Sequence, residues 1–303
     1  MRSTTLRRSW SRNSKEPALP ERFEVLATSE LAKGIFYIKV EAPLAVKRAL
    51  PGQFVIVRVD EPGERIPLTI MDHSVEEGTL EMVFQVAGTT TEKMSMLSVG
   101  DRLADVVGPL GRPTEIEKFG RVACVGGGVG TAALYPIARA MSGAGNEVKV
   151  LLGAKDRDYL ILMDRFEALD VDLKVATDDG SAGLHGFVTE LVLEAANEWK
   201  PDRVIAIGPL PMMRAVSMLT KEHGIHTVVS LNAIMLDGTG MCGTCRCEVG
   251  GETKFSCVDG PEFDGHLVDF EVLSSRLAAY KDEEKLSLDR LHQLRGLKSP
   301  ADK

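Results

Sequence analysis

Four of the chain's five cysteines lie between residues 242 and 257, and they are the strongest chemical signal in the sequence. Closely spaced thiolates bind metals, whereas five cysteines in 303 residues are too few for a disulfide scaffold. The pattern reads Asp237-x4-Cys242-x2-Cys245-x11-Cys257, with a further thiol at Cys247. These residues predict metal chemistry in a reducing compartment.

The spacing favours an iron–sulfur cluster over a zinc ion. Plant-type [2Fe–2S] ferredoxins use C-x4-C-x2-C with a distant fourth cysteine, and this chain has the same pattern with aspartate in the first place. A structural zinc ion needs four tetrahedral ligands, usually in two close pairs. Only Cys257 and the distant His266 follow the first group, so the zinc pairing is poor.

The identity of the fourth ligand stays open on spacing alone. Cys247 follows Cys245 by two residues, so a regular strand would place both thiols on one face. Asp237 lies in LDGTG, which is also an ordinary turn sequence. The segment CEVGGETKFSC predicts a hairpin that turns at Gly250–Gly251 and returns Cys257 toward the loop.

A glycine-rich turn in the middle of the chain predicts a dinucleotide site. The segment CVGGGVGTAALYPIARA places these glycines between an expected strand and an expected helix. Glycine lets the backbone approach a pyrophosphate closely, and a helix N-terminus supplies free N–H groups. The spacing departs from strict G-x-G-x-x-G, and such turns also occur for packing reasons. The candidate residues are Gly126, Gly127, Gly128, Gly130 and Thr131.

Two later stretches support the dinucleotide site. TDDGSAGLHG contains Asp178 and Asp179, and GPLPMMRAV contains Gly208, Pro209 and Met212. Both follow directly after expected strands, and ligands of doubly wound sheets bind at that edge. A solvated turn that caps the next helix is the alternative reading of the two aspartates.

The first third of the chain holds candidates for a flavin site. In RIPLTI, an arginine is followed closely by a hydroxyl and by backbone donors, which can clamp a diphosphate and line a flat ring. VAGTTTEKM adds a glycine and three hydroxyls, although each motif alone is commonplace. The candidate residues are Arg65, Pro67, Leu68, Thr69, Gly88, Thr89, Thr90 and Thr91.

Two kinds of elements are expected to position these residues. Short strands rich in Val, Ile and Phe, separated by Gly and Pro turns, run from residue 23 to about 107 and predict an antiparallel β-barrel. Strands then alternate with helices, which predicts an α/β doubly wound parallel sheet. These strands are expected at 121–125, 147–153, 173–177, 203–207 and 227–231.

Charge and composition narrow the function classes. The net charge of −8 argues against a nucleic acid partner. The sequence contains no run of 18 or more apolar residues, so no membrane-spanning helix is predicted. The first twenty residues are rich in Arg and Ser, and their first acid is Glu16. We expect a disordered extension there and a cytoplasmic protein, with an organelle transit peptide as the alternative.

The order of these motifs resembles the ferredoxin–NADP reductase superfamily over about residues 23–230. The resemblance implies FAD in the barrel, with Arg65 at its pyrophosphate and Pro67–Thr69 along the isoalloxazine ring. Gly88 and Thr91 match a second FAD-contacting loop, and the sheet domain would bind NAD(P). The usual flavin-binding motif of the superfamily, R-x-[YP]-[ST], is only partly matched here, because Pro67 and Leu68 replace part of it. Flavin contacts from these two residues would therefore come mainly from the backbone.

The cysteine segment, continued through VDGPEFDGHLVDF, resembles the cluster modules of two related families. The electron-transfer subunits of dihydroorotate dehydrogenase carry four cysteines. The small subunits of NADH-dependent ferredoxin:NADP oxidoreductases carry an aspartate followed by three cysteines, and this chain is similar to them. The resemblance implies that Asp237, Cys242, Cys245 and Cys257 hold a [2Fe–2S] cluster. Cys247 and Cys124 are then expected to be packing residues.

The second family implies an electron-transfer enzyme without a catalytic side chain, because the cofactors carry the chemistry. Electrons would pass between NAD(H), FAD and the cluster. The implied partner is a larger subunit with its own FAD and [4Fe–4S] clusters, which bifurcates electrons and serves ferredoxin. The alternatives are the dihydroorotate dehydrogenase subunit and, from another class, a zinc-stabilised module without activity. The segment GAKDRDY offers both cations and acids, so the choice between NAD and NADP stays open.

The chain is therefore expected to have five parts. They are a disordered extension (1–20), an FAD-binding barrel (21–115), an NAD(P)-binding domain (116–232), a cluster module (233–270) and a helical tail (271–303).

Overall fold

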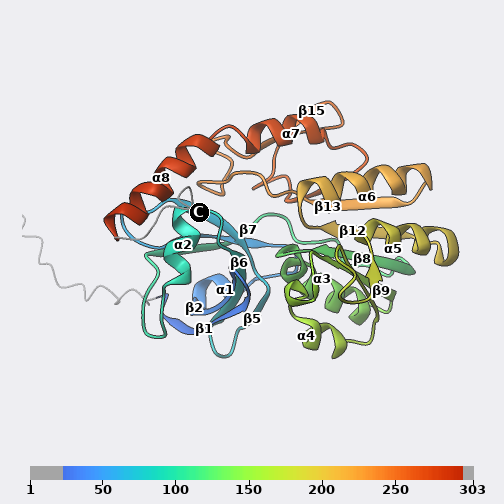
Figure 1. Cartoon of the computed structure of the whole chain (residues 1–303), viewed down its shortest axis with the longest axis horizontal. Coiled ribbons are helices and arrows are strands. Elements are labelled where there is room, and N and C mark those ends of the chain that lie inside the picture. The colour runs from blue at the N-terminus through green and yellow to red at the C-terminus, as the bar shows by residue number, and fades with distance from the viewer. Residues whose placement is uncertain (1–22, 296–303) are drawn as a thin grey trace, which may run out of the picture.

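The computed structural model describes residues 23–295 (Figure 1). The predictions made for residues 1–20, including the disordered extension and the organelle-targeting alternative, lie outside this range. In Figure 1, the antiparallel strands and the parallel sheet lie side by side, and the C-terminal segment runs across both. This arrangement confirms the predicted fold class.

The antiparallel half consists of a four-stranded sheet (β1-β2-β6-β5) and a three-stranded sheet (β4-β3-β7). Side chains of both sheets form one buried core, among them Ile38, Val55, Val57, Leu80 and Met82. The short helices α1 and α2 are Pro43–Val46 and Thr89–Ser95. The strands are β1 Val25–Ala32, β2 Ile35–Glu41, β3 Phe54–Arg58, β4 Arg65–Thr69, β5 Asp72–Ser74, β6 Thr79–Gln85 and β7 Asp105–Leu110.

The second half is a seven-stranded sheet in the order β11-β10-β9-β8-β12-β13-β16. All neighbours are parallel except β16, which pairs antiparallel with β13. From β8 the chain first moves outward to β9 and β10 and then returns to the other side, so the switch point lies between β8 and β12. The strands are β8 Arg121–Gly127, β9 Glu147–Ala154, β10 Asp172–Thr177, β11 Leu184–His185, β12 Arg203–Ile207, β13 His226–Ser230 and β16 Glu262–Asp264.

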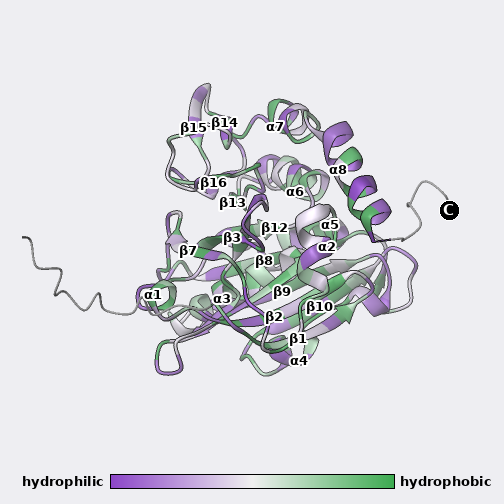
Figure 2. Cartoon of the chain, turned by 90° about the vertical axis from the view of Figure 1, so that its left-hand side faces the viewer, coloured by the Kyte–Doolittle hydropathy of each residue, from purple (hydrophilic) through white to green (hydrophobic). Residues whose placement is uncertain are grey.

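Helices connect the parallel strands, as expected for crossover connections. Their apolar faces pack on the sheet, and Figure 2 shows hydrophobic residues concentrated in its central strands. The helices are α3 Gly130–Gly143, α4 Met163–Glu167, α5 Val188–Glu194 and α6 Leu210–Glu222. A short 3₁₀ turn spans Arg157–Tyr159, and α5 continues as a π-helical turn over Ala195–Trp199.

The C-terminal part begins with the predicted hairpin, which the structure confirms. β14 (Arg246–Val249) pairs with β15 (Glu252–Phe255), and Gly250 and Gly251 supply the left-handed φ angles of +62° and +78° that a two-residue turn needs. Helices α7 (Phe270–Leu277) and α8 (Lys281–Leu294) follow.

Helix α8 crosses back to the antiparallel half and packs on α2 (Figure 1). The Thr89 hydroxyl donates to the Ser287 hydroxyl at 2.9 Å, and His292 Nε2 lies 3.6 Å from Glu92 Oε1. Leu291 of α8 is also buried. The tail therefore joins the cysteine segment to the barrel.

Candidate functional site

A cavity of about 540 Å³ lies between the antiparallel half and the parallel sheet. One wall is β4, which contributes Pro67, Leu68 and Thr69. The opposite wall contains Gly127, Gly128 and Gly130 from the turn between β8 and α3, together with Gly208 and Pro209 from the turn between β12 and α6. The structure thus brings together residues that the sequence analysis assigned separately to a flavin and to a dinucleotide.

The barrel wall includes residues that the sequence analysis missed. Phe54 of β3 and the end of β6, Val83 to Gln85, line the cavity beside β4. Phe84 also stacks on Phe36 at a centroid distance of 5.9 Å. Arg65 is exposed at the start of β4 and lies outside the cavity wall, on the strand whose other end lines it. The signal for these residues was weak, because ordinary alternating strands carry no binding motif.

The three predicted hydroxyls at the start of α2 have different surroundings. Thr91 lines the cavity, and its hydroxyl accepts hydrogen bonds from the backbone N–H groups of Ala87 (2.9 Å) and Gly88 (3.0 Å). Thr90 donates to Glu64 at 3.3 Å, and Thr89 is engaged by α8. Only Thr91 of the three borders the cavity.

The dinucleotide wall is built from two helix N-termini. Helices α3 and α6 both begin at the cavity, and neither is capped by a side-chain hydrogen bond within the described part of the chain. Backbone N–H groups at such uncapped ends attract phosphate oxygens. At α3 the N–H groups of Thr131 and Ala132 already donate to the Gly128 and Val129 carbonyls, at 3.2 and 3.1 Å. The fit of this wall to a pyrophosphate therefore rests on the absence of a side-chain cap at both helix ends in residues 23–295.

Glycine is required in this wall for two reasons. Gly128 has a left-handed φ of +54°, and a Cβ there would meet nothing within 4 Å, so its open side is available to a ligand. A Cβ at Gly130 would lie 2.5 Å from the Ile207 carbonyl oxygen and 2.7 Å from Gly208 Cα. Gly130 therefore lets α3 approach the neighbouring turn, while Met212 packs against Gly127 and Gly208.

The other predicted dinucleotide residues lie outside the cavity wall. Gly126 is in β8, and Thr131 is buried in α3. Asp178 and Asp179 follow β10, and Asp179 accepts a hydrogen bond from the Ser181 N–H at 2.9 Å. Hydrogen bonds from Ser181 lower the pKa of Asp179, so its carboxylate stays ionised in the turn. This geometry matches the alternative reading as a turn.

The segment after β13 connects the cavity to the cysteine loop. Ser230, Leu231, Asn232, Ala233 and Met235 line the cavity, and the predicted ligand segment begins two residues later. This wall was not predicted from the sequence, although it follows a strand at the edge where ligands of such sheets bind. The cavity and the cysteine loop are thus continuous along the backbone.

The four predicted cluster ligands fall into two pairs. Cys245 and Cys257 are buried, with their sulfur atoms 3.2 Å apart. Burial raises the pKa of Cys257 to about 12. Asp237 accepts hydrogen bonds from the N–H groups of Thr239 (2.8 Å) and Cys242 (2.7 Å), and these bonds lower its pKa. A [2Fe–2S] cluster uses two ligands on each iron, so this pairing of donors fits it.

The loop has the backbone freedom that such a cluster needs. Gly238, Gly240 and Gly243 all have left-handed φ angles, between +65° and +82°. A Cβ at Gly238 would lie 2.5 Å from Leu110 Cδ1, so the loop also approaches β7 closely. Among the described residues, no three His, Cys, Asp or Glu side chains are already gathered around one metal position.

Cys247 has partners of its own in the hairpin. It is buried, it accepts a hydrogen bond from the Ser256 hydroxyl at 3.4 Å, and it lies 3.7 Å from the Lys254 carbonyl oxygen. Burial raises its pKa. Cys124 is buried in the sheet, where burial raises its pKa to about 12. Both thiols are packing residues in this structure.

The zinc alternative receives no geometric support from His266. Its Nε2 atom lies 3.1 Å from the Thr220 hydroxyl, which in turn accepts a hydrogen bond from Thr227 at 2.6 Å. The imidazole is thus engaged by Thr220 of α6. Nothing in this arrangement directs it toward Cys257.

Comparisons with known proteins agree with this site. Residues 232–269 match the family model of the iron–sulfur cluster binding domain of dihydroorotate dehydrogenase B. A Thermotoga maritima protein, named an electron transfer subunit homologue of dihydroorotate dehydrogenase B (NAD(+)), is 48% identical over 273 residues, which cover 90% of this chain and 96% of that protein. The corresponding electron transfer subunit of Desulforamulus reducens is 33% identical over 256 residues, which cover 82% of this chain and 97% of that protein.

Solved structures give the same result. The structure of an NADH-dependent reduced ferredoxin-NADP oxidoreductase, studied for flavin-based electron bifurcation, has a chain 48% identical to this one, with a TM-score of 0.85. The match covers 89% of this chain and 98% of that chain. An Amycolatopsis cytochrome P450 reductase, at 23% identity and a TM-score of 0.58 over 68% of each chain, shares the fold alone. None of the helices in residues 23–295 has the length and apolar character to span a membrane.

Proposed function

The chain belongs to the family of dihydroorotate dehydrogenase B electron transfer subunits and their homologues, and we propose that it passes electrons between NAD(H), FAD and a [2Fe–2S] cluster in an electron-bifurcating complex. One observation carries this proposal. A single cavity is lined by β4, by two uncapped helix N-termini and by the segment that leads into the cysteine loop. Three cofactors placed along this surface would be neighbours.

Each wall has a distinct task in this proposal. The backbone of Pro67 to Thr69 would hold the flavin ring, Arg65 would bind the flavin pyrophosphate, and Thr91 would supply a second contact. The N-termini of α3 and α6 hold the dinucleotide phosphates. FAD, when bound, accepts two electrons from NADH as a hydride and passes them on singly, which a [2Fe–2S] cluster requires.

The cluster is held, in this proposal, by Asp237, Cys242, Cys245 and Cys257. The carboxylate already accepts the Cys242 N–H, so it is ionised and lies beside the residue with which it would share an iron. The loop tip is open to solvent, because Met241 is 88% exposed and Cys242 is also exposed. An exposed cluster loop is suited to electron exchange with another protein.

The relatives are subunits of larger complexes, so this chain works with a partner subunit. We propose that the partner is a larger subunit with its own FAD and [4Fe–4S] clusters, and that ferredoxin exchanges electrons with it. Support comes from the 48% identity to a chain of the bifurcating oxidoreductase. The second candidate partner is a dihydroorotate-oxidising subunit, which the matched cluster-domain family favours.

Affinity purification of the chain from its native host separates the two candidates. A co-purifying subunit with [4Fe–4S] clusters and NADPH-dependent ferredoxin reduction would support the bifurcating complex. A co-purifying subunit that oxidises dihydroorotate, with no [4Fe–4S] iron, would contradict it.

A further inference from the structure

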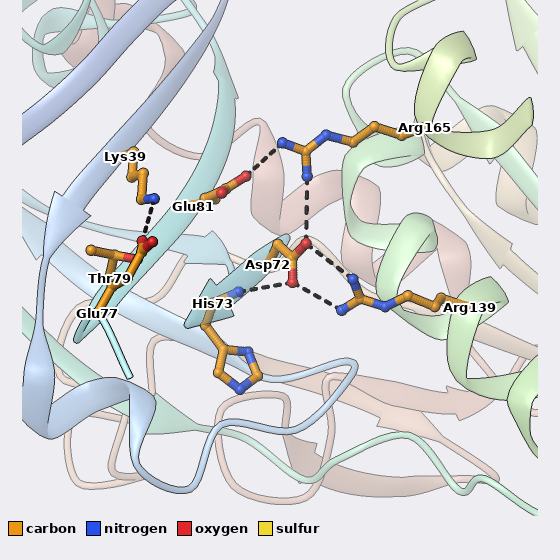
Figure 3. A network of polar contacts seen from close by, with 8 residues as sticks. All are labelled: Lys39, Asp72, His73, Glu77, Thr79, Glu81, Arg139 and Arg165. Carbon is orange, nitrogen blue, oxygen red and sulfur yellow. Dashed lines mark hydrogen bonds and ion pairs between the residues drawn. The ribbon is translucent and has the colours of Figure 1, made fainter. Parts of the chain in front are cut away.

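A network of charged side chains joins the antiparallel half of the molecule to helices α3 and α4 of the parallel half (Figure 3). Arg139 of α3 holds Asp72 of β5 with both ends of its guanidinium, at 3.0 and 2.9 Å. Arg165 of α4 donates to Glu81 of β6 at 2.7 Å and also reaches Asp72 at 3.5 Å. Two arginines of the sheet domain thus form ion pairs with two carboxylates of the barrel. We call these four residues the latch.

Aromatic side chains lie against the latch, whose members range from 17% exposed for Glu81 to 43% exposed for Arg139. Both guanidinium groups lie over the Tyr135 ring, at 5.2 Å for Arg139 and 5.7 Å for Arg165. Tyr37, on the barrel side, has its pKa raised to about 12, first by burial and then by the nearby Glu81. Asp72 side-chain exposure is only 20%. Burial opposes ionisation of Asp72, but the bonds and charge of Arg139 keep its pKa low.

The latch is connected directly to both walls of the cavity. Asp72 follows the cavity-lining Thr69 by three residues, and Glu81 precedes the cavity-lining Val83 by two. Arg139 lies nine residues along α3 from Gly130, which corresponds to about 14 Å of helix. A rotation of α3 by about 4° about the latch would therefore move its N-terminus by roughly 1 Å.

A displacement of this size is large for hydride transfer, because the reacting atoms must lie about 3–3.5 Å apart. Bidentate arginine–carboxylate pairs fix an angle as well as a distance. The network is thus built to hold the helix that presents the dinucleotide against the strands that present the flavin.

We propose that Asp72 is a positioning residue for hydride transfer, which it serves by holding Arg139 and Arg165 and so fixing α3 relative to β4. The role rests on the proposed exchange of electrons between NAD(H) and FAD. In that step the reduced nicotinamide loses a hydride, two electrons with one proton, and the flavin gains it. Asp72 lies outside the lining of the cavity, and it exchanges no proton in this role.

The test compares Asp72→Asn with the wild type by rapid mixing of the flavin-loaded chain with NADH without oxygen. We expect the maximal rate of flavin reduction to fall by about 10- to 100-fold, while the half-saturating NADH concentration changes by less than about threefold. Flavin content should stay at the wild-type level. Arg139→Gln should also slow the reduction, although it leaves the Arg165–Asp72 contact in place. The double variant should be no slower than Asp72→Asn alone, because the Arg139–Asp72 pair is already lost in that variant.

Glu77→Gln is the matched control. Glu77 pairs with Lys39 at 2.7 Å on the same face of the barrel, but both partners belong to the barrel and the pair does not cross to α3 (Figure 3). This variant makes the same chemical change and should reduce flavin at the wild-type rate.

A second readout needs no cofactor. The chain has four tyrosines, of which Tyr37 and Tyr135 lie at the latch. In ¹⁹F spectra of the chain labelled with fluorotyrosine, Asp72→Asn should shift and broaden these two signals and leave Tyr280 unchanged.

The outcomes separate the two proposals. Wild-type rates and unchanged ¹⁹F signals in both latch variants would overturn the positioning role while leaving the proposed function intact. If flavin reduction is slow in the latch variants but equally slow in Glu77→Gln, the positioning role would also be overturned. A wild-type chain whose flavin is not reduced by NADH would refute the proposed function, and the positioning role with it.

Discussion

Gly128 gives the sharpest test of the dinucleotide wall, because a second glycine supplies a matched control. Gly128 and Gly145 both have left-handed φ angles, +54° and +82°, and a Cβ at either would meet nothing within 4 Å. They differ in position. Gly128 lines the cavity before α3, whereas Gly145 lies between the end of α3 and β9, at the opposite edge of the sheet.

Backbone strain should therefore be the same in the two alanine variants. An L-residue in the left-handed region costs about 1–2 kcal/mol, so we expect Gly128→Ala and Gly145→Ala each to lower the free energy of unfolding by that amount. The methyl group at Gly128 would in addition occupy the space through which a phosphate oxygen approaches the backbone to about 2.9 Å. Loss of one such charge-assisted hydrogen bond is worth about 1.5–3 kcal/mol, or roughly 10- to 100-fold in Kd.

Denaturant titration measures the stability of the two variants, and NADH titration of the flavin-loaded chain measures Kd. Gly128→Ala should bind NADH at least about tenfold more weakly than Gly145→Ala at equal stability. Equal NADH affinity in the two variants would refute the assignment of this turn to the dinucleotide.

Three further substitutions test the cysteine loop, its exposed tip and the C-terminal helix. Asp237→Ala should lose or destabilise the cluster while Cys247→Ala keeps it, as measured by iron content and visible absorbance. The reverse result would show that Cys247, and not Asp237, is the fourth ligand. Met241→Asp should weaken binding to the partner subunit without changing iron or flavin content, because Met241 is 88% exposed at the loop tip; unchanged co-purification would place the interface elsewhere. Leu291→Ala should destabilise the contact of α8 with α2 by about 2 kcal/mol and speed amide exchange in α8, and no change in exchange would show that α8 is held by other contacts.

The sequence predicted the parallel sheet well, because its central strands are continuous apolar runs. β8, for example, is buried at every position after Arg121. It did not reveal β11 and β16, which have two and three residues and few buried side chains. β16 pairs with β13 only because the cysteine segment folds back onto the sheet, and local patterns carry no information on such a return.

In the candidate site too, local patterns predicted some residues and missed those that depend on distant contacts. Glycines and proline at the ends of strands marked the cavity, because backbone approach restricts residue type. The hydroxyls of Thr89 and Thr90 looked equivalent to that of Thr91, since no local signal shows that α8 and Glu64 engage them. Asp72 and Arg139 are 67 residues apart, and as single charged residues they had no signal at all.

Anaerobic titration of the purified chain with NADH, followed by visible absorbance and electron paramagnetic resonance together, tests the central claim most directly. We expect NADH to bleach the flavin and the signal of a reduced [2Fe–2S] cluster then to appear. Asp237→Ala should abolish the cluster signal while flavin bleaching continues. A flavin that NADH reduces without any cluster signal in the wild-type chain would contradict the proposed electron path.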